Sequence, residues 1–378
     1  MVNRINSLEC IVPPHMLREI VERGSPAQRN LAIRTLRISE QFRGQRQASA
    51  GLPALAAATV IGEKHRIIYH ADFGSTLPGR QVRAEGDAPT GDPAVDEAYD
   101  GSGVTYDLYR DVYGRNSIDG NGLRLDSTVH YQKGYDNAFW NGQQMVYGDG
   151  DEDLPEPERL FNRFTIAIDI IGHELTHGVT QYEARLIYWD QPGALNESFS
   201  DVFGSLVKQR KLGQSANEAD WIIGQGLFTS NVKGQGIRSL KAPGTAYDDP
   251  VLGKDPQPAH MKDYKNVSYD NGGVHINSGI PNRAFYVAAM EIGGNAWEKA
   301  GQVWYVTLRD KLLDRSDFQA AANLTYQTAA QLFGAGSLEQ QAVRKGWFEV
   351  GITVEGTEAP KGCLPTVMNV FRPAARAR

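Results

Sequence analysis

The segment IIGHELTHGV, residues 171–180, places two histidines around a glutamate within an apolar stretch. On an α-helix, His173 and His177 project from one face because they are four residues apart, so both imidazoles can bind one metal ion. Glu174 lies beside that face, where it can take a proton from an attacking water without being a ligand. A helix with two surface histidines is the alternative interpretation, since so short a motif also occurs by chance.

The segment GALNESFSD, residues 193–201, offers the third ligand that such a site needs. Glu197 and Asp201 are four residues apart in a predicted helix, so both can face the same point. Glu197 can complete a set of three protein ligands, and Asp201 can accept the other N–H of a ligating histidine. The alternative interpretation is a helix that carries these two acids on its exposed surface. Because both acids occur where a zinc site needs them, the sequence favours a zinc site.

A third histidine, His275, lies in the glycine-rich segment DNGGVHINSG, residues 270–279. A single histidine in a loop is usually structural. Here it can also act as a cation or an N–H donor that faces the oxyanion formed when water attacks a carbonyl group.

Composition restricts the class of protein and its partners. With 378 residues, 41% hydrophobic and 22% charged, the chain has the composition of a globular protein. A net charge of −6 indicates no nucleic-acid partner, and no apolar run is long enough for membrane insertion. Cys10 and Cys363 lie near opposite ends and form no disulfide framework. The N-terminus has no secretory signal pattern, so we expect synthesis in the cytoplasm and, if the protein is exported, an unconventional route.

The chain changes pattern along its length. Residues 1–50 contain two short helical patterns, which are too small for an independent domain. Residues 51–165 show strand and turn signals, and residues 166–353 contain long amphipathic helical segments. We therefore predict an α+β fold with a β-rich N-terminal lobe and a mostly helical C-terminal lobe, and a zinc site in the cleft between them. Residues 354–378 form a C-terminal extension of unknown role.

The acidic segment YGDGDEDLPEPE, residues 147–158, resembles the start of a calcium loop. Leu154 and Leu160 stand where an EF-hand needs glycine and a bidentate glutamate, so this loop is excluded. We predict a solvated acidic loop.

Five segments resemble, in order and at compatible spacings, the signature segments of the thermolysin family of zinc metallopeptidases. They are NAFWNGQQMVYGDGD, HELTHGVTQYEARLIY, GALNESFSDVFG, IRSL and DNGGVHINSGIPNRAFY. The resemblance covers residues 55–353 and is far more specific than the histidine motif alone. It implies a thermolysin-like two-lobed fold and a zinc-dependent endopeptidase that cuts polypeptides internally.

The resemblance also implies roles for individual residues. His173, His177 and Glu197 would bind one zinc ion per chain, Glu174 would act as the general base, and Asp201 would orient a ligand histidine. Three further residues would serve catalysis near the substrate: Tyr188 would hydrogen-bond the oxyanion beside His275, and Asp270 would orient that imidazole.

Substrate-binding positions follow from the same resemblance. Arg238 would hold a substrate carbonyl, and the peptide would lie extended against Asn137 and the backbone of Ala138. An apolar pocket would receive the residue after the scissile bond, which predicts cleavage before bulky apolar residues; ordinary core packing is the alternative for each pocket residue. The pocket residues are Phe161, Phe164, Ile170, Ile223, Leu227 and Ile237.

The sequence departs from the family at its calcium pair. The matching positions are Asp169, Lys208, Asp220, Ile222 and Gln225, so only two of the five are acids. We predict that no calcium pair binds there and that the ammonium of Lys208 pairs with Asp169. The sequence leaves open whether calcium binds at another site in the chain.

The leader is the second departure, because VPPHMLREIVERGS, residues 12–25, resembles the short leader of protealysin-like members of the family. We expect residues 1–50 to be an inhibitory prosegment that binds its own chain and is removed by cleavage within residues 44–57. A permanent pair of structural helices is the alternative. Cys10 could supply a thiolate to the open zinc position as a cysteine switch, or could be a buried small apolar group.

Two other classes of protein stay as alternatives. A zinc aminopeptidase would share the histidine motif, but its ligand spacing and flanking segments differ. An inactive binding module would keep the fold without turnover, yet every matched catalytic position carries the competent residue. We expect the monomer that is typical of the family.

Overall fold

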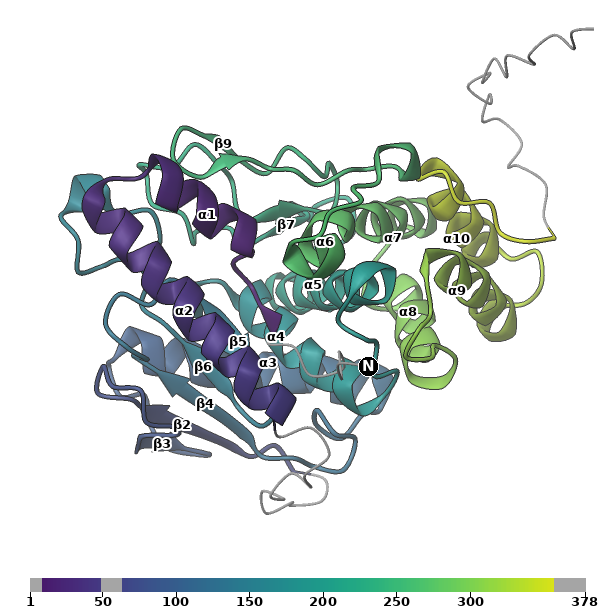
Figure 1. Cartoon of the computed structure of the whole chain (residues 1–378). Helices are drawn as coiled ribbons and strands as arrows, with labels where there is room; N and C mark the ends of the chain where they lie inside the picture. The colour runs from purple at the N-terminus through teal and green to yellow at the C-terminus, as the bar shows by residue number, and fades with distance from the viewer. Residues whose placement is uncertain (1–8, 49–62, 357–378) are drawn as a thin grey trace, which may run out of the picture.

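The computed structural model describes residues 9–48 and 63–356. The expected cleavage stretch lies largely outside these ranges, as do Cys363 and most of the C-terminal extension. Within the described ranges, the chain forms a lobe built on a β-sheet and a lobe built of helices (Figure 1). The predicted α+β fold with two lobes is therefore confirmed. None of the described helices combines the length and the apolar character needed to cross a membrane.

The N-terminal lobe contains a mixed six-stranded sheet with the order β1-β5-β6-β4-β2-β3. The central strands run parallel, since β2 pairs with β4 and β4 pairs with β6, whereas the outer pairs are antiparallel. Helix α3, Pro93–Tyr113, packs on the sheet and is capped by Asp92, whose side chain accepts hydrogen bonds from the first turn. The strands are β1 Glu9–Cys10, β2 Arg66–His70, β3 Arg80–Ala84, β4 Leu125–Val129, β5 Ala138–Trp140 and β6 Met145–Tyr147.

The C-terminal lobe is mostly helical. Two short antiparallel strand pairs and the 3-10 turn η3 accompany its helices, and two further 3-10 turns, η1 and η2, lead from the sheet lobe to α4. The helices are α4 Ile168–Tyr182, α5 Asp190–Leu212, α6 Asp270–Asn277, α7 Gly279–Ile292, α8 Lys299–Asp310, α9 Phe318–Phe333 and α10 Leu338–Glu349. The strand pairs are β7 Ile222–Ile223 with β8 Arg238–Ser239, and β9 Asp248–Asp249 with β10 Gly253–Lys254; the turns are η1 Glu156–Glu158, η2 Phe164–Ile166 and η3 Met261–Asp263.

Helix α4 joins the two lobes, because it contacts β5 on one side and α5 on the other. Two glycines allow α4 and α5 to approach closely: a Cβ on Gly172 would lie 3.1 Å from the Cα of Gly204. A Cβ on Gly204 would lie only 2.4 Å from the carbonyl oxygen of Asp169. The motif HELTH on α4 and the segment NESFSD on α5 therefore face each other at short range.

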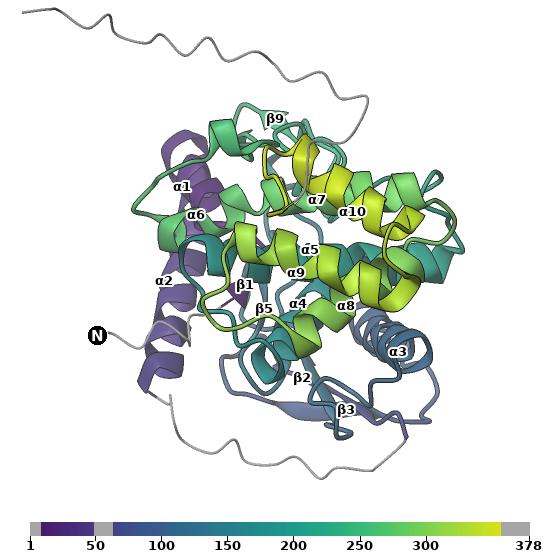
Figure 2. The same ribbon diagram turned by 90° about the vertical axis from the view of Figure 1, so that its right-hand side faces the viewer.

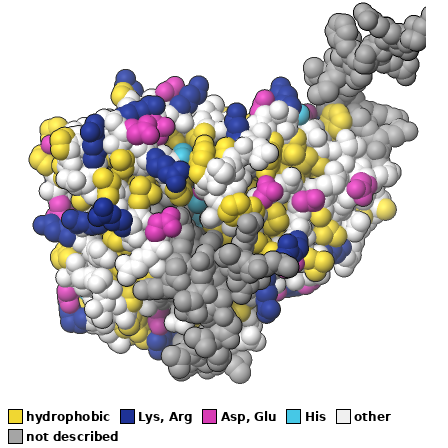
Figure 3. All heavy atoms as spheres, in the orientation of Figure 1, with side chains coloured by type: hydrophobic (Ala, Val, Ile, Leu, Met, Phe, Trp, Pro, Cys, Tyr) yellow, Lys and Arg dark blue, Asp and Glu magenta, His cyan; other side chains and the backbone are white. Residues whose placement is uncertain are grey.

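The leader lies along one side of the molecule, across both lobes (Figures 1 and 2). It contributes the edge strand β1 and two helices, α1 Pro14–Arg23 and α2 Pro26–Ala48. Met16, Leu17 and Ile20 of α1 have the spacing of one helical face and are buried. Charged side chains lie outward over α1 and α2 in the space-filling view (Figure 3). The leader therefore packs as an amphipathic element of the fold.

A buried ammonium joins α4, α5 and the segment before β7. Lys208 Nζ lies 2.9 Å from Asp169 Oδ2 and 2.9 Å from Asp220 Oδ1, and it donates to the carbonyl of Ile222 at 2.6 Å. Burial alone would lower the pKa of Lys208, but the charges of Asp169 and Asp220 outweigh burial and raise the pKa. The predicted pairing of Lys208 with Asp169 is confirmed, whereas the prediction that no calcium pair binds remains a prediction.

Substitution Lys208→Met is expected to lower the free energy of unfolding by about 3 kcal/mol, because Asp169 would keep a buried charge with its partner removed. Urea unfolding of the two chains measures this difference. Lys211→Met is the matched control, since Lys211 lies on the same helix and is exposed. Equal losses in the two variants would contradict a stabilising role for the buried ammonium.

Candidate active site

Helices α4 and α5 bring three buried side chains to one point. His173 Nε2 and His177 Nε2 lie 3.0 Å apart. Glu197 Oε2 lies 3.6 Å from His173 Nε2, and its Oε1 lies 3.4 Å from His177 Nε2. The ligand atoms of the three residues all lie within 4.8 Å of one another, and none of the side chains is exposed to solvent. The structure therefore assembles the ligand group that the sequence predicts.

The hydrogen bonds around the two imidazoles show that the group fits a cation. His173 Nδ1 lies 2.8 Å from Asp201 Oδ1, and His177 Nδ1 lies 2.8 Å from Asn196 Oδ1. Because both partners are acceptors, each Nδ1 carries the proton and each Nε2 presents a lone pair. Burial, with the neighbouring His173, holds the pKa of His177 well below its usual value, so this imidazole is neutral. Two facing lone pairs repel each other unless a cation lies between them.

The chemistry of the donor set indicates zinc. Glu197 Oε2 is buried and has no hydrogen-bond donor among residues 9–48 and 63–356. Two imidazole nitrogens and one carboxylate are the protein ligands of many catalytic zinc sites, in which a fourth position stays open. His173, His177 and Glu197 would hold the ion.

Asp201 is the anionic partner that fixes His173. It also accepts two hydrogen bonds from Arg238, at 2.8 Å each from Nε and Nη2, and one from Asn282 Nδ2 at 2.8 Å. Burial would raise the pKa of Asp201, but the charge of Arg238 outweighs it and holds that pKa far below its usual range. The carboxylate therefore stays ionised.

Glu174 follows the first histidine on α4 and is fully buried. Its Oε2 accepts the backbone N–H of Trp140 in β5 at 3.0 Å. This bond ties the carboxylate to β5, and its neighbour on α4, His173, belongs to the ligand group. That position suits a general base for a water that attacks a peptide carbonyl.

Three residues form a hydrogen-bonded group beside the ligands. His275 Nδ1 lies 2.5 Å from Asp270 Oδ1, and Tyr188 Oη lies 3.1 Å from His275 Nε2 and also hydrogen-bonds Glu197. Burial would lower the pKa of His275, but the charge of Asp270 outweighs it and raises that pKa. The imidazole and the phenol can therefore both donate to an oxyanion.

The local sequence explains how Asp270 reaches His275. The first residues of α6 have positive φ values, 53° at Asp270, 82° at Gly272 and 83° at Gly273. Glycine adopts such values at low cost, so the chain can turn and place the aspartate carboxylate under the imidazole. Asp270 Oδ2 also accepts the backbone N–H of His275 at 3.0 Å.

The backbone of the leader occupies the predicted peptide-binding groups. The carbonyl of Cys10 lies 3.0 Å from His275 Nε2, and the carbonyl of Ile11 accepts from Arg238 Nη1 at 3.1 Å. Ile11 N–H donates to the carbonyl of Ala138 at 3.2 Å, and Val12 N–H donates to Asn137 Oδ1 at 2.9 Å. Asn137, Ala138 and Arg238 thus all hydrogen-bond one extended segment, and this segment is the leader of the same chain.

The cysteine-switch prediction is corrected by the direction of the Cys10 side chain. Its Sγ lies 3.9 Å from Ser39 Oγ of α2, and the residue packs with apolar side chains such as Phe139 and Val146. The thiol is not part of the ligand group that the described residues form. In a strand the carbonyl lies near the plane of the sheet and the side chain projects out of it, so at residue 10 the carbonyl can face His275 while the thiol faces α2.

The six predicted pocket residues are all buried in the main hydrophobic core, which also contains Ile11. Several are neighbours: Ile237 N–H bonds the carbonyl of Ile223 at 2.8 Å, and the rings of Phe161 and Phe164 lie 5.9 Å apart. Their proximity is compatible with a pocket and with ordinary core packing, so the pocket stays a prediction.

The sequence did not predict several residues that position the active-site side chains. Trp140 N–H, Asn196 and Asn282 position the acids and imidazoles described above. Asn196 carried a signal, because Ser200 lies one helical turn later and also contacts His177 Nδ1, at 3.0 Å. The prediction of a solvated acidic loop holds for Glu152, Asp153 and Glu156, which are exposed, but not for Asp151. Asp151 is 1% exposed, because its carboxylate accepts the N–H groups of two buried backbone positions, residues 160 and 161.

Comparisons with known proteins agree with this geometry. The family model described as thermolysin metallopeptidase, catalytic domain, matches residues 63–181, and the one described as thermolysin metallopeptidase, alpha-helical domain, matches residues 184–352. An extracellular metalloprotease of Pectobacterium carotovorum subsp. carotovorum is 50% identical over 351 residues, which cover 91% of this chain and 96% of the relative. Protease PrtS of Photorhabdus sp. (strain Az29) is 47% identical over 355 residues, 93% of this chain and 94% of the relative.

The same relationship holds in three dimensions. The precursor of protealysin, a metalloproteinase from Serratia proteamaculans, is 54% identical and superposes with a TM-score of 0.82, over 91% of this chain and 100% of the other. A zinc-type ligand group between a β-rich lobe and a helical lobe, two family models and these relatives lead to one assignment. The chain belongs to the thermolysin family of zinc metallopeptidases, which hydrolyse peptide bonds.

Proposed function

We propose that this chain is a zinc endopeptidase made as a latent precursor, with Glu174 as its general base and the leader as its intramolecular inhibitor. The observation that carries the proposal is the course of residues 9–12, which lie extended beside the ligand group. A site that binds this stretch through its backbone can bind the interior of another polypeptide in the same way.

Peptide binding rests mainly on the backbone. Strand β1 pairs with β5 in antiparallel register, Glu9 with Trp140 and Cys10 with Phe139. Addition of a strand to a sheet edge gives affinity through main-chain hydrogen bonds, whereas pockets for side chains give specificity. Arg238 adds a fixed donor for one carbonyl. This mode suits an enzyme that cuts inside chains and needs no free terminus.

The chemistry divides between the metal and the side chains. Zinc, when bound, polarises the attacking water and the substrate carbonyl. Glu174, held by Trp140, takes the proton from the water and delivers it to the leaving nitrogen. Tyr188 and His275 donate hydrogen bonds to the oxygen on which negative charge develops. Asp270 keeps the imidazole of His275 oriented and protonated.

Latency follows from competition for the same donors. While Cys10 and Ile11 use His275 and Arg238, a substrate carbonyl cannot reach either group. Helix α1 holds this segment in place with a buried apolar face, and Ser25 hydrogen-bonds Glu158 of the enzyme body at 2.5 Å. Removal of the leader would free the donors and the edge of β5. A leader that stays in place permanently is the alternative that the first experiment below tests.

Export from the cell is part of the proposal. The relative from Pectobacterium carotovorum is named an extracellular metalloprotease, and half of its residues are identical over nearly its full length. Action as a monomer remains a prediction.

Incubation of the purified full-length chain is expected to release the leader and then degrade an unstructured protein such as casein, both inhibited by a zinc chelator. Glu174→Gln should reduce the rate of both reactions by roughly 10³-fold or more, because the general base is lost, while zinc content is unchanged. Intact mass, casein hydrolysis and atomic absorption measure the three quantities.

The alternatives give different results in that experiment. A chain that binds zinc and cuts nothing, even after another protease has removed the leader, would indicate an inactive binding module. Full activity with the leader still attached would refute the inhibitory role and support a permanent structural pair of helices.

Cleavage before bulky apolar residues is the second expectation. Among peptides varied only after the scissile bond, kcat/KM for leucine should exceed that for aspartate by about 10²-fold or more, since the six pocket residues are apolar and a buried carboxylate would lack a partner. Variation of the residue before the scissile bond serves as the control. A preference for charged residues after the bond would exclude the pocket assignment.

A further inference from the structure

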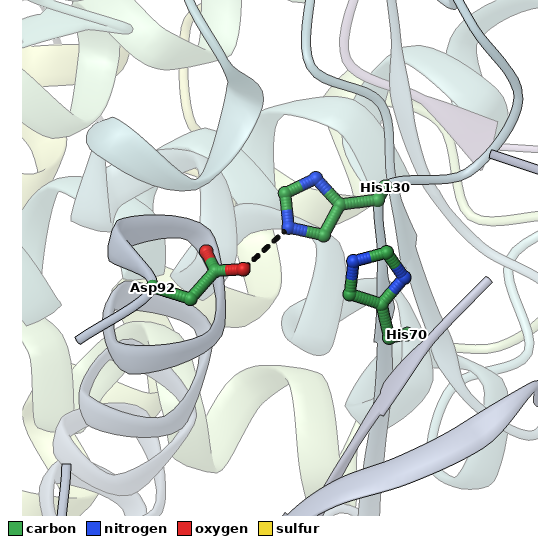
Figure 4. Close-up of side chains that lie close together, drawn as sticks. All are labelled: His70, Asp92 and His130. Atoms are coloured by element: carbon green, nitrogen blue, oxygen red, sulfur yellow. Dashed lines mark hydrogen bonds and ion pairs between the residues drawn. The ribbon is translucent and has the colours of Figure 1, made fainter. Parts of the chain in front are cut away.

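A second group of possible metal ligands lies in the N-terminal lobe, away from the α4–α5 site. His70 is the last residue of β2, His130 follows the end of β4, and Asp92 caps the N-terminus of α3. Because β2 and β4 are parallel neighbours and His70 pairs in register with Val129, their carboxyl ends place the two histidines side by side. Figure 4 shows the two imidazoles and the carboxylate gathered around a common space.

The distances suit a single small ion. One ligand atom from each residue lies within 4.8 Å of the other two. His130 Nε2 lies 3.0 Å from Asp92 Oδ2, and the two imidazole centroids lie 4.3 Å apart. The side chains of His70, His130 and Asp92 are 16%, 14% and 34% exposed. The group is therefore enclosed enough to be ordered and open enough for an ion to enter from solvent.

In each imidazole, Nδ1, the ring nitrogen that faces away from the centre of the group, lies near a carboxylate. His130 Nδ1 lies 2.8 Å from Asp149 Oδ2. His70 Nδ1 lies 3.1 Å from Asp72 Oδ1 and accepts the backbone N–H of Asp72 at 2.8 Å. When Nδ1–H of His130 donates to Asp149, Nε2 of that ring presents its lone pair to the centre of the group. His70 can do the same once its proton moves to Nδ1, where Asp72 Oδ1 accepts it in place of the backbone N–H. Histidines that bind metals usually have such a carboxylate or carbonyl partner, which fixes the tautomer and the orientation of the ring.

Asp92 is also prepared to act as a ligand. Its Oδ1 accepts the N–H of Ala94 at 3.0 Å and caps α3, while its Oδ2 faces His130. Arg80 lies next to this group, and its guanidinium is 2.9 Å from Asp72 Oδ1. Three aspartates thus surround two histidines and one arginine, a balance that favours a bound cation.

We propose that His70, His130 and Asp92 bind a second zinc ion that links the ends of β2 and β4 to the start of α3. Two imidazoles and one carboxylate suit zinc among the common divalent ions, with water as the fourth ligand. The site serves stability, because an ion that binds only the folded chain shifts unfolding to higher temperature. It is independent of the proposed catalytic mechanism.

The test uses the full-length chain carrying Glu174→Gln, which prevents self-cleavage, and compares it with two added variants. His70→Gln removes one ligand and leaves both contacts of His130. Asp92→Asn removes a ligand charge and keeps the cap of α3, since asparagine is also a favoured capping residue. His65→Gln is the matched control, a partly buried histidine just before β2 and outside the group.

Zinc content is measured by atomic absorption after dialysis against buffered zinc. The His70→Gln and Asp92→Asn chains should each contain one zinc ion fewer per chain than the parent, and the His65→Gln control should contain as many as the parent. Raising free zinc above the level that fills the catalytic site should increase Tm in the parent and the control only. Equal zinc content in all four chains would overturn the proposal, as would an equal loss in the control. A zinc-dependent rise in Tm that persists in both His70→Gln and Asp92→Asn would overturn it as well.

Discussion

The buried pair of Asp201 and Arg238 is the interaction on which the active site depends. One carboxylate accepts the Nδ1–H of a zinc ligand, His173, and two hydrogen bonds from the guanidinium that holds the Ile11 carbonyl. Both side chains are almost fully buried, so removal of either would leave an unpaired charge in the core. Metal geometry and peptide binding are therefore coupled through one ion pair, which joins α5 to β8.

In the proposed precursor, the leader uses this coupled site as a substrate would. Its backbone adds a strand to β5, and the carbonyls of Cys10 and Ile11 lie on His275 and Arg238. Inhibition through the backbone places little demand on the identity of the inhibiting side chains. The thiol of Cys10 can therefore pack against α2, and a metal-binding side chain in the leader is unnecessary.

Each lobe contains a separate group of charged side chains that bears on stability. At the junction of α4 and α5, the ammonium of Lys208 lies between the carboxylates of Asp169 and Asp220. In the sheet lobe, histidines and aspartates converge where parallel strands end. Lys208 supplies a positive charge to buried Asp169, and the proposed zinc ion would supply one to Asp92, because carboxylates withdrawn from water need a counter-charge.

The sequence by itself determined the local parts of this protein. Spacings of four residues on α4 and α5 predicted which side chains share a helix face, and the change from strand to helix patterns predicted the two lobes. Only the tertiary structure decided the direction of Cys10, the burial of Asp151 and the meeting of His70 with His130, sixty positions apart in the chain. Helical periodicity is set by the backbone within one turn, whereas strand register and the side chain that faces a partner are set by contacts between distant segments.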